Sequence, residues 1–292
     1  MTTDGVHTVL DGLAFGEGPR WHDGALYFSD MHEHRVVRLP ASGPAETVVE
    51  VVDDEPSGLG WLPDGRLLVV AMETQRLLRV EPDGKLVEHA DLSPIARGSL
   101  NDMIVAGDGT AYVGDMGSRI QARTSERRPG QTIMVAPDGT FAVGADDLAS
   151  PNGHILSDDG RTLIIGESAG ACLTAFDVAG DGALSARRVF APLVAAREGR
   201  PAVADGICLD RDGAVWVADP VNGRVFRVLE GGEVTAAITF DDVIPVACVL
   251  GGEDRRTLYM CVAADWRREV VTASRTGRID ACRVDIPGAG RP

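Results

Sequence analysis

Short apolar runs separated by Asp-Gly turns recur along the chain. Each unit starts with a small or polar residue, continues through mostly apolar positions to the turn, and then enters a run rich in Val, Ile, Leu and aromatic residues. Gly and Asp accept the positive φ angles that tight turns require, so each unit predicts a β-hairpin. The turns are Asp23-Gly24, Asp64-Gly65, Asp108-Gly109, Asp159-Gly160, Asp212-Gly213 and, in a variant form, Asp254-Arg255.

The spacing of these units predicts the architecture. Their first residues lie 40 to 53 positions apart, which is the period of β-propeller blades. Further apolar runs and turns after most hairpins add two strands to each unit, and no segment shows a sustained helical period. We therefore predict an all-β fold, a six-bladed β-propeller with four antiparallel strands per blade, formed by residues 1–292 as a single domain. Segments near His7–Leu10 and Ile279–Val284 are expected to close the ring in the last blade.

The first strand of each blade lines the central channel of a propeller, so equivalent residues of the repeat share one ring around the axis. Four of its six members carry carboxylate or amide oxygens suited to a cation, and two of these are carboxylates, which are costly to bury unless a cation pairs them. All-oxygen donors favour one divalent ion, with Ca²⁺ first and Mg²⁺, Mn²⁺ or Zn²⁺ as alternatives. The ring consists of Glu17, Ser57, Asn101, Asn152, Asp205 and Ala247.

Composition narrows the classes of partner and location. The formal net charge of −16 disfavours phosphate backbones and anionic lipid, so neither nucleic acid nor membrane is expected as a partner. No stretch approaches the roughly 18 apolar residues of a membrane helix, and Met1–His7 carries no leader pattern. The expectation is a cytoplasmic monomer whose five cysteines are buried, reduced thiols.

The connections after the second strands are expected on the same face as the ring. One of them, Met116–Gln131, is long and contains Arg119, Arg123, Arg127 and Arg128. It is interpreted either as a lid over the site or as a solvated loop. His32, His34 and His154 also lie on or near this face, as wall residues rather than catalysts.

Several motifs together resemble one known family. They are Glu17-Gly-Pro-Arg-Trp, Ser57-Gly-Leu, Leu100-Asn101-Asp102, Ser150-Pro151-Asn152-Gly153, Asp205-Gly206-Ile207, Trp216-Val217-Ala218-Asp219 and Leu250-Gly251-Gly252.

With these motifs the sequence resembles the senescence marker protein/gluconolactonase/luciferin-regenerating enzyme family over nearly its whole length. The resemblance implies a six-bladed propeller in which Glu17, Asn152 and Asp205 hold a single metal ion. Asn101 is then a substrate contact or an additional ligand, as in the related diisopropyl fluorophosphatase propellers. Sugar lactonases of the family often carry an arginine where this chain has Ser99, and Arg97 lies two residues further back. This departure leaves room for a less polar lactone or ester.

The resulting hypothesis is a metal-dependent hydrolase that opens a small lactone or ester with an activated water. Asp205 is the candidate general base, and Asn101 with the metal would stabilise the oxyanion. Asn101, Ser99, Asp102 and His154 are the candidate substrate contacts. Alternatives left open are attack by Asp205 as a nucleophile, hydrolysis of organophosphorus esters at the same site, and a non-catalytic metal-binding propeller.

Overall fold

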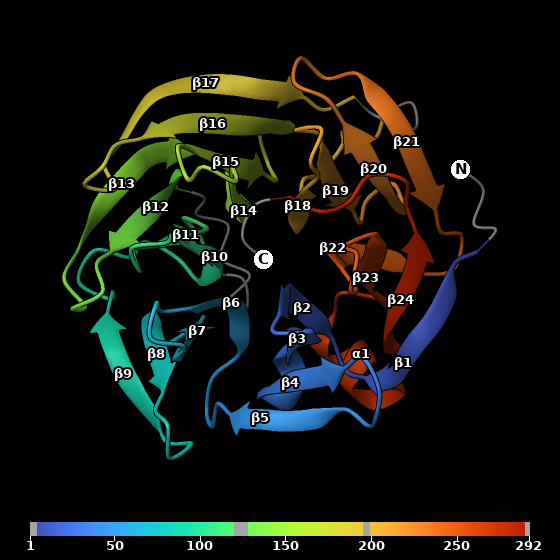
Figure 1. The fold of residues 1–292 in the computed structure, drawn as a ribbon, viewed down its shortest axis with the longest axis horizontal. Helices are drawn as coiled ribbons and strands as arrows, with labels where there is room; N and C mark the ends of the chain where they lie inside the picture. The colour runs from blue at the N-terminus through green and yellow to red at the C-terminus, as the bar shows by residue number, and fades with distance from the viewer. Residues whose placement is uncertain (1–4, 120–127, 195–198, 290–292) are drawn as a thin grey trace.

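Six four-stranded antiparallel sheets surround a central axis in the computed structural model, which describes residues 5–119, 128–194 and 199–289 (Figure 1). The prediction of a six-bladed β-propeller is confirmed. Each of the first five blades is one stretch of chain whose strands follow one another outward from the axis. These blades are β2 (Gly16–His22), β3 (Ala25–Asp30), β4 (Arg35–Pro40) and β5 (Glu46–Glu50); β6 (Pro56–Trp61), β7 (Leu67–Ala71), β8 (Arg76–Val80) and β9 (Leu86–Asp91); β10 (Leu100–Val105), β11 (Ala111–Asp115), β12 (Gly130–Val135) and β13 (Phe141–Leu148); β14 (Pro151–Leu156), β15 (Thr162–Glu167), β16 (Cys172–Val178) and β17 (Leu184–Pro192); and β18 (Ile207–Leu209), β19 (Val215–Asp219), β20 (Arg224–Val228) and β21 (Val234–Thr239).

The sixth blade joins the two ends of the chain, as the sequence predicted. The first strand of the chain supplies the outermost position, where His7 lies opposite Ala281. The hydroxyl of Thr8 donates to a carboxylate oxygen of Asp280 across this pair at 2.7 Å. The closure pairs the terminal strand edges with each other instead of leaving them free. From the axis outward the blade consists of β22 (Ile244–Gly251), β23 (Thr257–Ala263), β24 (Gly277–Arg283) and β1 (His7–Leu13).

The Asp-Gly turns explain why the inner hairpins form at fixed places. The Asp64 side chain accepts the backbone N–H of Arg66 at 3.1 Å, and Gly65 between them has a φ of 87°. This local hydrogen bond and the positive φ reverse the chain within a few residues. In the sixth blade Arg255 adopts the left-handed conformation, with a φ of 59°.

The core lies between the faces of neighbouring blades. Val36 and Val49 of the first blade pack in one cluster with Leu59 and Val69 of the second, and all four are buried. Similar clusters join the other blades. The β-strand alternation of the sequence therefore becomes a series of apolar layers that hold the blades around the axis.

Two short helical segments lie among the connections. The 3-10 turn η1 (Met31–Glu33) follows β3, and α1 (Arg268–Ser274) follows β23. The connection after β23 therefore contains a short helix. Only two turns long and with Val271 as its one buried residue, α1 leaves no periodic signal in the sequence. Within the described ranges, no helix is long and apolar enough to cross a bilayer.

All five cysteines are free thiols, and all but Cys172 are buried. Cys208 and Cys248, on the inner strands of neighbouring blades, place their sulfur atoms 3.8 Å apart. The expectation of complete burial is thus wrong for Cys172 alone, because it begins the third strand of its blade next to a surface connection.

Candidate active site

A cavity of about 540 Å³ lies at the axis, and the two carboxylates and two amides of the predicted ring line it. Glu17 comes from β2, Asn101 from β10 and Asn152 from β14, while Asp205 lies two residues before the start of β18. The structure thus brings together side chains from four different blades, separated by up to 188 positions in the chain.

The ring residues lie at local irregularities of the inner hairpins. A β-bulge inserts an extra residue into one strand and re-aims the side chains there. Such shifts of pairing recur at the same position of the repeat, so the ring residues do not follow the regular strand alternation. In the blades of Glu17, Asn101 and Asn152 the shifts fall between Glu17 and Arg20, between Leu100 and Met103, and between Pro151 and His154.

Glycines after the ring residues allow the inner strands to approach one another closely. A Cβ atom on Gly153 would lie 2.7 Å from the carbonyl oxygen of Asp205, and one on Gly206 would lie 2.5 Å from the Cβ of Ala247. Both distances are below van der Waals contact. Only glycine therefore permits the spacing that places Asn152 beside Asp205.

The ionised forms of Glu17 and Asp205 are electrostatically unfavourable when no cation is bound. The pKa of Asp205 is raised to about 7, chiefly by burial and in part by the negative charges of Asp102 and Asp219, while a hydrogen bond from Asn152 opposes the rise. Burial and the nearby Asp205 raise the pKa of Glu17 well above its usual value. A cation bound between two buried carboxylates would offset the repulsion between their negative charges.

The donor chemistry fits a hard divalent cation. The Nδ2 atom of Asn152 donates to Asp205 Oδ1 at 2.5 Å, and Ser57 Oγ donates to Asn101 Oδ1 at 2.9 Å. In the described part of the chain, no three His, Cys, Asp or Glu side chains gather as potential ligands. A metal ion here would therefore depend on the amide oxygens as well as the two carboxylates, which suits Ca²⁺ better than zinc.

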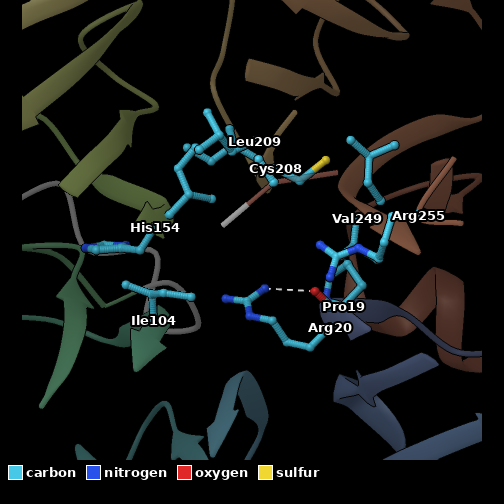
Figure 2. Close-up of a pocket in the computed structure, with 12 residues that line it drawn as sticks. Pro19, Arg20, Ile104, His154, Cys208, Leu209, Val249 and Arg255 are labelled. Carbon is cyan, nitrogen blue, oxygen red and sulfur yellow. Dashed lines mark hydrogen bonds between the residues drawn. The ribbon is translucent and has the colours of Figure 1, made fainter. Parts of the chain in front are cut away.

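Asp102 and His154 lie behind the ring and have structural partners. Asp102 accepts a hydrogen bond from Arg20 Nη2 at 2.7 Å and one from the backbone N–H of His154 at 3.2 Å. The His154 ring contacts the Asn152 carbonyl oxygen at 2.5 Å and Thr132 Oγ1 at 3.0 Å, and burial lowers its pKa. His154 and Arg20 line a separate cavity of about 20 Å³, the size of one water molecule, shown in Figure 2.

Ser99 is also placed beside the site rather than in it. Its hydroxyl is fully buried and donates to Glu73 Oε1 at 2.5 Å. Arg97 pairs with Asp146 at 2.5 Å and 2.9 Å. Arg97 and Ser99 are absent from the described lining of the large cavity, as are Asp102 and His154. The roles of Ser99, Asp102 and His154 as substrate contacts therefore stay predictions.

The structure places the predicted wall residue His32 in the cavity lining and adds residues that the sequence did not single out. The Nδ1 of His32 lies 2.9 Å from Glu55 Oε1. Arg268 at the start of α1 reaches the same carboxylate at 3.3 Å. Trp266 and Arg267 also line the cavity. Residue type alone carried no signal for Trp266 and Arg267, because they lie in the irregular connection between β23 and α1.

The long connection over Met116–Gln131 is described only at its ends. Arg119 donates to the backbone carbonyl of Glu73 and lies 3.4 Å from its carboxylate. Arg123 and Arg127 lie outside the described residues. The predicted lid or solvated loop thus falls largely outside the described residues.

Comparison with known proteins places this geometry in a family. Residues 15–264 match the sequence model of the SMP-30/Gluconolactonase/LRE-like region. The chain is 27% identical over 291 residues to 6-deoxy-6-sulfogluconolactonase of Pseudomonas putida, covering 97% of this chain and 96% of that one. It is 29% identical over 261 residues to regucalcin of Gallus gallus, covering 87% and 85%. A solved luciferin-regenerating enzyme superimposes with a TM-score of 0.81 at 20% identity, covering 98% of both chains. The protein belongs to the SMP-30/gluconolactonase/luciferin-regenerating enzyme-like family.

Proposed function

We propose that this protein is a divalent-metal-dependent hydrolase that opens lactone rings. Glu17, Asn152 and Asp205 would hold the ion, with Asn101 as a further ligand or a substrate contact. The observation that carries the proposal is the meeting of two mutually repelling carboxylates and two amides in one cavity at the axis. The lactonase name of the Pseudomonas putida relative, similar over nearly the full length of both chains, supports lactone chemistry.

A bound divalent ion would polarise the substrate carbonyl and acidify a nearby water. The chain itself supplies the remaining functions. Asp205 would accept the proton of the attacking water through a carboxylate oxygen that the ion leaves free. Asn101 donates through Nδ2 to the oxygen on which negative charge develops. Glu17 balances the charge of the ion.

The test compares chelated protein with protein re-supplied with Ca²⁺, Mg²⁺, Mn²⁺ or Zn²⁺. Lactone opening is followed by proton release, and ion binding by calorimetry. We expect chelation to abolish turnover and one ion to restore it. Glu17→Gln and Asp205→Asn should lose ion binding and turnover together, whereas Asp83→Asn, at an exposed turn, should retain both.

Each contrary result has a distinct meaning. Full turnover in chelated protein would contradict the metal dependence. Hydrolysis of phosphotriesters without that of any lactone would move the assignment to the organophosphorus alternative. Tight ion binding without turnover of either class would indicate a non-catalytic metal-binding propeller.

A further inference from the structure

Three methionines occupy equivalent positions of the first three blades. Met31, Met72 and Met116 each follow the last residue of the second strand, and all three line the cavity. Each donates its backbone N–H to the carbonyl located two residues before the ring residue of its own blade. This shared hydrogen bond fixes every methionine beside the ring. The accepting residues are Phe15 at 2.8 Å, Glu55 at 3.0 Å and Ser99 at 3.0 Å.

The other three blades have no such side chain at this position. By the register of the repeat, the equivalent residues are Ser168, Pro220 and Ala263. Ser168 makes the same backbone hydrogen bond, to the carbonyl of Ser150 at 3.0 Å, so the position is structurally equivalent while the chemistry differs. The thioethers therefore form a wall on one side of the cavity only.

Two aromatic side chains extend this wall. Phe15 lines the cavity and is buried, whereas Trp266 lines it while remaining 61% exposed. Isolated large apolar side chains are common on surfaces, but this one borders a cavity whose adjoining wall is apolar. We name the set Phe15, Met31, Met72, Met116 and Trp266 the apolar wall.

The polar groups near the wall are engaged with one another. Glu55 pairs with both His32 and Arg268, and Arg267 pairs with Asp265 at 2.5 Å. The Nδ2 atom of Asn101 faces the sulfur of Met116 at 3.5 Å. A polyhydroxylated ring against this wall would exchange hydrogen bonds with water for contacts with thioethers, which is unfavourable.

We propose that the substrate is a lactone with an apolar substituent, an alkyl chain or an aryl ring, which packs against the apolar wall. The assignment rests on the proposed lactonase function and specifies its substrate class. The lactone carbonyl lies toward Glu17, Asn101 and Asp205, and the substituent lies toward the methionines. Because methionine is unbranched and adaptable, the wall accommodates substituents of several shapes. A cavity of about 540 Å³ is in the range of small-ligand sites.

The test measures kcat/KM of the metal-loaded enzyme for γ-butyrolactone, γ-nonalactone and glucono-δ-lactone. Burial of one methylene corresponds to about 4-fold, so the pentyl substituent of γ-nonalactone should raise kcat/KM at least 30-fold over γ-butyrolactone. Glucono-δ-lactone should be the poorest substrate. Equal or higher kcat/KM for glucono-δ-lactone would overturn the assignment.

Variants connect the preference to the wall. Trp266→Gln should lower the ratio of kcat/KM for γ-nonalactone over γ-butyrolactone at least 5-fold, and Trp266→Phe should largely keep it. Met31→Gln should lower the same ratio, while Met134→Gln, in β12 and outside the cavity lining, should leave it unchanged. Since Trp266 is exposed, its replacement does not threaten folding. An unchanged ratio in both Trp266→Gln and Met31→Gln would refute the role of the wall.

A binding measurement separates this proposal from the lactonase assignment. The non-hydrolysable ketones 2-pentylcyclopentanone and cyclopentanone are titrated while tryptophan fluorescence is recorded, and the pentyl compound should bind at least 30-fold more tightly. Chain-dependent ketone binding without turnover of any lactone would contradict the proposed function and retain the apolar site. Lactone turnover with equal affinity for both ketones would retain the function and overturn the apolar site. Neither turnover nor chain preference would overturn both.

Discussion

Replacing Asp205 by Asn should have opposite effects on ion-free and ion-loaded protein. The substitution removes one charge and keeps the side-chain volume and an oxygen that can accept from Asn152. In the ion-free protein, burial raises the pKa of Asp205 from 3.8 to about 7. Because one pKa unit corresponds to about 1.4 kcal/mol, the ionised carboxylate destabilises the fold by at most about 4 kcal/mol at pH 8. Asp205 faces the cavity and keeps partial solvent contact, so screening reduces the expected gain to about 2 kcal/mol.

The pH dependence follows from the direction of this pKa change. A carboxyl whose pKa is higher in the folded state holds its proton there when the unfolded chain has already lost it. Between about pH 4 and pH 7 the folded state therefore binds more protons, and its stability falls as pH rises. The ion-free wild type should show this fall. The variant should show a smaller one, because Glu17, whose pKa is raised in the same direction, remains.

Thermal unfolding with EDTA and with Ca²⁺ measures both effects. Without ion, the variant should melt about 4 °C above the wild type at pH 8. An ion at 100 times its Kd should stabilise the wild type by about 2.7 kcal/mol and the variant by almost nothing. Asp83→Asn serves as the matched control with unchanged behaviour. A less stable ion-free variant, or equal stabilisation of both proteins by Ca²⁺, would refute the reasoning.

Three other substitutions test the frame around the site. Asp102→Ala leaves the Arg20 guanidinium, now paired at 2.7 Å and almost fully buried, without a carboxylate and should cost about 3–5 kcal/mol in urea unfolding; a loss below about 1 kcal/mol would contradict the importance of the pair. Gly153→Ala places a Cβ 2.7 Å from the Asp205 carbonyl oxygen, so the strands must separate and calorimetry should show at least 10-fold weaker ion binding; unchanged affinity would exclude that contact as the determinant of spacing. Asp115→Ala removes a buried carboxylate that accepts three backbone N–H groups and should cost about 2–4 kcal/mol in urea, whereas a neutral effect would mean that solvent replaces these bonds.

Features that arise locally and repeat along the chain could be predicted from the amino-acid sequence. The hairpins follow from strand alternation and from turns such as Asp64-Gly65, whose hydrogen bond spans only two residues. Their period identified the propeller, and the propeller placed equivalent residues on one ring. For this reason the repeat groups Glu17, Asn101, Asn152 and Asp205, and the structure brings them to one cavity.

The sequence did not predict which neighbours of the ring residues line the cavity and which support the ring from behind, because this depends on the tertiary structure. Asp102 directly follows Asn101, yet the shift of pairing in β10 and the distant Arg20 hold it behind the ring. The position of Trp266 at the cavity depends on the connection after β23 and on α1, a seven-residue helix. A helix this short is not stable by itself. Burial, and with it the pKa of Asp205, is a property of the assembled blades. These features depend on contacts between residues far apart in the chain, which local propensity and repeat spacing do not encode.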